Sequence, residues 1–179
     1  MRKIVSVTSV FALLLAVAAR GGEFKAPKPG PEHEKFKDMV GVWDAKVESK
    51  GKESTATMHY KVGLGGLWLL EHFQGEFEGK KFEGMGATSY DPAKKKYVNV
   101  WIDSMSTSPM VSEGNYDKAG KMVMKGQMPL PDGKTIPMTM TLEMKDKNNM
   151  VFVATGTAGG KEFEMMKITY TRKKTGRGE

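Results

Sequence analysis

The chain has 179 residues, no cysteine and a formal net charge of +7. This length fits one domain of about 150 residues with an appendage. The lack of cysteine excludes disulfides, thiolate metal sites and cysteine nucleophiles, so a packed core must stabilise the fold. The basic clusters at 94–96 and 172–174 are not interleaved with aromatic residues. We therefore expect no nucleic-acid partner, and only peripheral contact, if any, with an anionic membrane surface.

The N-terminal segment has the composition of a secretory signal peptide. Arg2 and Lys3 precede an apolar run over residues 4–19 that ends in small residues. A positive start, a short apolar centre and an A-x-A-like end are typical of signal peptides. The alternative is a membrane anchor, but the run is short of the ~20 strongly apolar residues that a span needs. We expect a signal peptide over residues 1–19, and a periplasmic or secreted protein.

A short helix is predicted between this segment and the main domain. Residues 20–30 are rich in Gly, Pro and Lys, which predicts a flexible leader. Pro31–Met39 starts with proline, has acidic residues in its first turn and basic residues later, which favours a helix. We expect residues 31–174 to form a single domain and residues 175–179 a disordered tail.

After Gly41 the pattern switches to alternation with period two, which predicts β-strands. Such segments cover residues 42–49, 54–62, 67–77, 81–90, 97–104, 110–116, 121–128, 136–145, 150–156 and 162–171. Hairpin-length turns separate them, and no long helix intervenes, which argues against βαβ units. A meander of this length must curl to hide its edges. We therefore predict an all-β fold, an antiparallel up-and-down meander of about ten strands closed into a barrel with room for a small ligand.

The predicted strand at 97–104 has two different faces. One face is mixed aromatic and polar, and carries Tyr97, Asn99, Trp101 and Asp103. The other is apolar, and carries Val98, Val100 and Ile102. We interpret the apolar face as a core stripe and the mixed face as the lining of a cavity or groove.

Three carboxylates occupy strand positions where a purely structural design would favour apolar residues: Glu71, Asp103 and Glu113. A buried carboxylate is costly unless it is paired or hydrogen-bonded. One interpretation is a polar cluster in a pocket that orients a ligand or takes a proton. The other is structural, with the acids bonded at the barrel rim or facing solvent.

The chain is rich in methionine and poor in metal-binding patterns. Met138 and Met140 share a strand face, and two thioethers side by side can bind Cu(I). Methionine is also an adaptable filler of cores and apolar pockets, and we favour that interpretation. The three histidines lack zinc-site spacing. We therefore expect no metal and no cofactor.

Gly41-Val42-Trp43 resembles the G-x-W opening of lipocalin-like (calycin) barrels. In those barrels the Trp closes the base and a basic residue of the last strand packs over it, which implies this role for Trp43 and Arg172. Further segments of the chain resemble an exported bacterial family of uncharacterised function that is related to the calycins. These segments are residues 66–73, 82–86, 90–91, 97, 101–105 and 112–114. The resemblance implies a closed barrel that binds a small apolar or amphipathic molecule, and it transfers no catalytic residue. Haem-binding relatives use a late-strand His, and this chain has none after His72.

Three functions follow as alternatives. The first is an exported binding protein that holds a small hydrophobic or amphipathic ligand in the barrel. The second is a hydrolase or isomerase that uses carboxylates of the cavity, and the third is an interaction module with a filled barrel. The candidate ligand-binding residues are Trp101, Asp103, Glu113, Glu71, Tyr97, Asn99, Met138 and Met140.

Overall fold

The computed structural model describes residues 25–77, 79–130 and 132–174. The signal peptide predicted for residues 1–19 and the tail predicted for residues 175–179 lie outside the described residues. So does the first part of the predicted leader. In the described part of the chain, no helix is long and apolar enough to cross a membrane.

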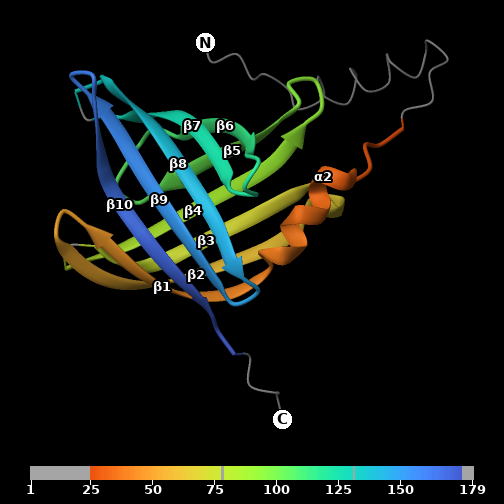
Figure 1. Cartoon of the computed structure of the whole chain (residues 1–179), viewed down its shortest axis with the longest axis horizontal. Helices are drawn as coiled ribbons and strands as arrows, with labels where there is room; N and C mark the ends of the chain where they lie inside the picture. Colours follow the sequence, from red (N-terminus) through yellow and green to blue (C-terminus); the bar gives the residue numbers. More distant parts are fainter. Residues whose placement is uncertain (1–24, 78, 131, 175–179) are drawn as a thin grey trace, which may run out of the picture.

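Ten antiparallel strands form the body of the molecule (Figure 1). They are β1 (Gly41–Ser49), β2 (Lys52–Gly63), β3 (Trp68–Phe77), β4 (Lys80–Asp91), β5 (Lys96–Asp103), β6 (Met110–Tyr116), β7 (Met122–Pro129), β8 (Thr135–Asp146), β9 (Asn149–Ala158) and β10 (Lys161–Arg172). Short helical turns precede β1 and β3: α2 (Pro31–Glu34), η1 (Lys35–Asp38) and η2 (Leu64–Gly66). The observed strands confirm the predicted fold, because their bounds differ from the predicted ones by two residues at most.

The strands follow one another in sequence order around a closed barrel. β1 pairs with β2 on one side and with β10 on the other, where Trp43 lies opposite Arg172. Pairing of the first and last strands leaves no unpaired sheet edge, which is how a meander of this length avoids exposing its backbone hydrogen-bonding groups.

Alternation along each strand divides its residues between the lumen and the outside. The inner face is mostly large, apolar and methionine-rich. Its most deeply buried members are Trp43, Met58, Tyr60, Leu69, Phe73, Tyr97, Met122, Met124, Met138, Met140, Met150, Ile168 and Tyr170. Met138 and Met140, interpreted from the sequence as fillers of a core or apolar pocket, belong to this buried inner face.

The interpretation of Val98, Val100 and Ile102 as a core stripe is wrong. These residues lie on the outer face of β5, where Val100 is 38% exposed and Ile102 is 52% exposed. The opposite face of β5, which begins with the buried Tyr97, points into the barrel. Hydrophobicity alone assigns this strand to the wrong side because the lumen beside it holds polar groups.

The short helix packs across one end of the barrel (Figure 1). Phe36 is fully buried there, with its ring 6.0 Å from that of Tyr97. Trp43 Nε1 donates a hydrogen bond to the Met39 carbonyl at 2.9 Å. The Arg172 guanidinium lies over the Trp43 ring, 4.0 Å from its centroid, a cation–π contact that joins the last strand to the first. This end of the barrel is thus covered.

A candidate ligand site in the barrel lumen

Glu71 lies on the inner face of β3, near the middle of the barrel. Its backbone neighbours are Tyr60 on β2 and Gly86 on β4. A Cβ atom at position 86 would lie 2.9 Å from the Glu71 carboxyl carbon. A side chain at position 86 would therefore displace the carboxylate, and glycine leaves it the space to lie against β4.

Two neutral side chains hold this carboxylate. Thr88 Oγ1 donates a hydrogen bond to Glu71 Oε1 at 2.7 Å, and Asn99 Nδ2 donates to the same oxygen at 2.9 Å. Asn99 Nδ2 also lies 2.8 Å from Thr88 Oγ1, which fixes the two donors relative to each other. Because Thr88 and Asn99 are register partners on β4 and β5, three consecutive strands build the arrangement.

The surroundings of Glu71 disfavour its charged form. Burial raises the pKa of Glu71 from its usual 4.5 to about 7, and the hydrogen bonds from Thr88 and Asn99 offset only part of this effect. Glu71 faces inward but is only partly buried, so its side chain keeps some accessible surface. An inner-face group that stays accessible borders internal space. Near neutral pH it can therefore exchange a proton or meet a ligand.

Two tyrosines share this environment. Burial raises the pKa of Tyr60 and Tyr170 above their usual range, and the nearby Glu71 charge adds to the shift in each case. Both phenols therefore stay neutral at physiological pH. Among the described residues, no lysine, arginine or histidine forms an ion pair with Glu71.

Trp101 lies beside Glu71 on the inner wall, over two glycines of β4. A Cβ atom at Gly84 would come within 2.2 Å of the indole ring, and one at Gly86 within 3.0 Å. Trp101 Nε1 donates to Asp103 Oδ2 at 3.0 Å, and Asp103 Oδ1 accepts from the Met105 backbone N–H at 2.9 Å. Asp103 thus orients the indole at the end of β5, and the indole forms part of the lumen wall.

The remaining predicted inner residues form the wall and the base of the lumen. Met138 and Met140 are 8% exposed on the inner face of β8. Tyr97 donates its hydroxyl to the Glu32 carbonyl at 2.8 Å, so it ties the helix to the barrel. Ser112, the register partner of Asn99, is buried, and its hydroxyl has no hydrogen-bond partner.

Glu113, a candidate ligand-binding residue, lies outside the lumen, so of the two interpretations of the three acids the solvent-facing one holds for it. Glu113 is on the outer face of β6, bonded to Lys96 Nζ at 2.7 Å and Lys94 Nζ at 3.1 Å. These lysines lower its pKa, as expected for a solvated ion pair. Glu71, Asp103 and Glu113 therefore do not form one cluster.

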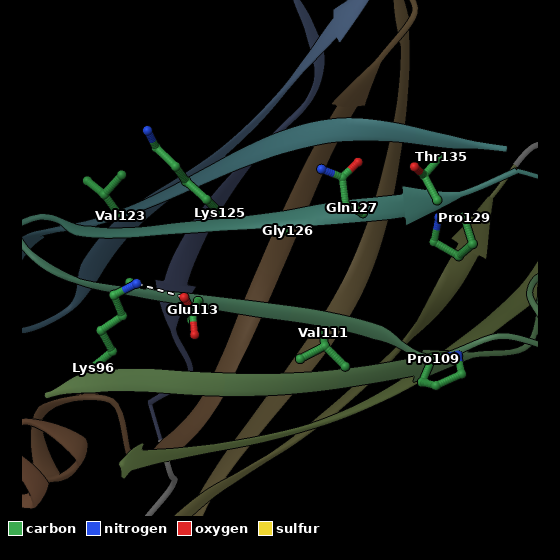
Figure 2. Close-up of a pocket in the computed structure, with 11 residues that line it drawn as sticks. Lys96, Pro109, Val111, Glu113, Val123, Lys125, Gly126, Gln127, Pro129 and Thr135 are labelled. Atoms are coloured by element: carbon green, nitrogen blue, oxygen red, sulfur yellow. Dashed lines mark hydrogen bonds and ion pairs between the residues drawn. The ribbon is translucent and has the colours of Figure 1, made fainter. Parts of the chain in front are cut away.

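A shallow hollow of about 680 Å³ lies on the outer face of β6 and β7. Figure 2 shows it lined by Val111, Glu113 and Lys125 among others, with Glu113 turned toward Lys96. The Glu113 carboxylate in this hollow is already paired with lysines, and the hollow is open to solvent. Its polar groups therefore do not converge on a ligand. The lumen instead combines an apolar wall with a few inward polar groups, which is typical of small-molecule sites.

The inner surface of the barrel is not completely packed. Several inner-face side chains keep accessible surface, namely Glu71, Asn99, Trp101, Leu142 and Phe152 along the wall and Asp103 at the end of β5. Accessible surface on the inside of a closed sheet requires space there. In the part of the chain that the structure describes, no group of three acidic, His or Cys residues could hold a metal.

Sequence reasoning missed Thr88, Tyr60 and Tyr170. Thr88 could have been found, because alternation from Gly84 and Gly86 places it on the same face of its strand. The two tyrosines give no such signal. Tyr60 is the register partner of Glu71 on β2, and Tyr170 interacts electrostatically with Glu71 from β10, which only barrel closure brings near.

Comparison with known proteins bears on family and fold. A family model described as "Protein of unknown function (DUF1579)" matches residues 28–172. No curated protein matches the sequence. The S-type phycobiliprotein lyase CPES from Guillardia theta is 12% identical, with 83% of this chain and 100% of that chain covered and a TM-score of 0.56. A redesigned β-barrel bound to DFHBI is 14% identical, with coverages of 75% and 99% and a TM-score of 0.41. At these identities the lyase shares the fold alone.

Proposed function

The chain belongs to the DUF1579 family, and we propose that it is a binding protein whose barrel lumen holds a small hydrophobic or amphipathic ligand. One observation carries the proposal: side chains on the inner face of a closed barrel keep accessible surface around a small polar group. Methionine and aromatic side chains supply the apolar wall, and the helix covers one end. A ligand would therefore enter from the end that holds Trp101 and Asp103.

The composition of the wall supports a ligand with a sizeable apolar part. Methionine side chains are flexible and polarizable, so they adapt to apolar ligands of irregular shape. Burial of apolar surface contributes about 25 cal/mol per Å², which favours a hydrophobic molecule over a polar metabolite. The few inward polar groups would fix the orientation of the ligand rather than supply most of its binding free energy.

A titration with the neutral dye N-phenyl-1-naphthylamine tests the proposal. We expect saturable binding with a rise in dye fluorescence, because the dye leaves water for an apolar environment. Leu142→Trp should weaken binding about tenfold or more, since Leu142 is partly accessible on the inner face of β8 and a larger ring would occupy the space.

Thr141→Trp is the matched control, because Thr141 precedes Leu142 on the same strand and faces outward. We expect it to bind the dye as the wild type does. Circular dichroism of both variants would establish that each is folded. Equal binding by the two variants would place the dye on the outer surface and contradict the proposal.

We also propose that the protein works outside the cytoplasm, on the basis of its N-terminal sequence. The intact mass of protein recovered from the periplasm or medium of an expressing bacterium tests this. Removal of about the first 19 residues is expected, and an uncleaved chain retained in the cytoplasm would contradict it.

A further inference from the structure

One oxygen of the luminal carboxylate lacks a partner. Both hydrogen bonds to Glu71, from Thr88 and from Asn99, go to Oε1. Oε2 accepts none from the described residues, and it lies against Gly86, where there is no side chain. The position that a second donor would occupy is therefore left to something other than this part of the chain.

The groups around Glu71 supply no positive charge. Tyr60 is its register partner on β2, Tyr170 on β10 lies near enough for the Glu71 charge to raise its pKa, and both phenols are neutral. β4 contributes Thr88, and β5 contributes Asn99, neither of which titrates. Asp103, the inner-face acid of β5, accepts a hydrogen bond from Trp101. The strands around Glu71 thus surround an acid without supplying a cation, an arrangement that is costly for the protein alone.

We propose that the lumen selects ligands in which an apolar body carries a protonated or quaternary nitrogen, and that Glu71 is the counter-ion of that nitrogen. This inference rests on the proposed function. A cation would complete the ion pair that the barrel leaves open. Trp101 and the phenol rings of Tyr60 and Tyr170 add aromatic surface, and a cation close to such rings gains further electrostatic stabilisation.

The same geometry makes cation binding depend on pH. A bound cation favours the charged form of Glu71, whose pKa in the empty protein is about 7. Below pH 7 binding of a quaternary cation must therefore release a proton, and its affinity should rise as the pH increases through 7. Tyr60 and Tyr170 stay neutral across this range, so they do not contribute to the change.

Three ligands with the same twelve-carbon chain test the selection: dodecyltrimethylammonium and dodecanoate, each below its micellar concentration, and dodecanol below its solubility limit. Displacement of N-phenyl-1-naphthylamine from the full-length mature protein reports their affinities at pH 6 and pH 8. We expect the quaternary cation to bind about tenfold or more tightly than dodecanol at pH 8, and dodecanoate to bind weakest. Only the cation should bind more weakly at pH 6.

Glu71→Gln is the decisive variant, because glutamine keeps an oxygen for Thr88 and Asn99 while it removes the charge. We expect it to abolish both the preference for the cation over dodecanol and the pH dependence of cation binding. Glu113→Gln is the control, since it neutralises an exposed acid on the outer face and should behave as wild type.

The outcomes separate this inference from the proposed function. If the dye and dodecanol bind in the lumen but the cation has no advantage, or keeps it in Glu71→Gln, the inference is wrong and the proposed function stands. A preference for dodecanoate would also overturn it. If no ligand binds and Leu142→Trp does not affect the dye, the proposed function itself fails.

Discussion

The charged form of Glu71 destabilises the folded protein. The barrel encloses a carboxylate and gives it two neutral donors, Thr88 and Asn99, but no cation among the described residues. Its pKa is raised, mainly by burial, to about 7. A protein selected for stability alone would place an apolar residue there. The carboxylate is therefore best explained by an interaction that the isolated chain does not complete.

The raised pKa predicts how stability depends on pH. The pKa of Glu71 is higher in the folded state than in the unfolded state. Between pH 4.5 and 7 the folded state therefore binds more protons than the unfolded state does. The contribution of Glu71 to the free energy of unfolding therefore falls as the pH rises through this window. Glu71→Gln should be about 1 to 3 kcal/mol more stable relative to wild type at pH 8 than at pH 4.

Urea denaturation of both proteins across this pH range measures that difference. Glu113→Gln serves again as the control, since lysines lower the pKa of Glu113 and its neutralisation should not give a stabilisation that grows with pH. A difference between Glu71→Gln and wild type that stays constant from pH 4 to pH 8 would contradict the burial of a titrating carboxylate.

The sequence predicts Glu71 as a site residue, but it predicts only some of the residues around it. An acid on an otherwise apolar strand face is visible without a structure. Its partner Asn99 was predicted as part of the same lining, whereas Tyr170 becomes a neighbour only when β10 closes against β1. The side on which Glu113 lies could not be predicted, because period two separates two faces without saying which is inner.

Strand β5 shows that alternation along a strand does not reveal which face points into the barrel. Its bounds and its two faces could be predicted, but the apolar face lies outside. Val100, Ile102 and the neighbouring Val111 on β6 are all exposed. The inner face of β5 carries Asn99 because this residue bonds to Glu71 and Thr88 on the two preceding strands. In a barrel with a partly polar lumen, the more hydrophobic face of a strand need not be the buried one.

Two isoleucines test this assignment by the same substitution. Ile102 is 52% exposed on the outer face of β5, and Ile168 is 4% exposed on the inner face of β10. Ile102→Thr should change the free energy of unfolding by about 0.5 kcal/mol or less. Ile168→Thr should cost about 2 kcal/mol or more, because it removes buried methyl groups and buries a hydroxyl. Urea denaturation compares the two, and a larger loss for Ile102→Thr would reverse the assignment of the two faces.

For the whole molecule, the fold could be predicted from the sequence, whereas the function could not. Ten alternating segments with hairpin-length links leave few options besides a closed meander, so the fold could be predicted. Whether the interior is open depends on side-chain volumes summed over ten strands and on glycines such as Gly84 and Gly86. No local sequence pattern predicts the free volume inside the barrel. The chemistry of a ligand is harder still to predict, because it depends on which side chains border that volume.

If ligand enters the lumen, the methionine side chains that line it should report the contact. Methyl groups labelled with ¹³C on methionine report contacts on both sides of the barrel at once. Met138, Met140 and Met150 are buried on the inner face, whereas Met85 and Met105 are 54% and 60% exposed. Titration with N-phenyl-1-naphthylamine should shift the inner methyl signals and leave those of Met85 and Met105 in place. Shifts confined to Met85 and Met105 would mean that the dye binds the outer face, and would contradict a binding lumen.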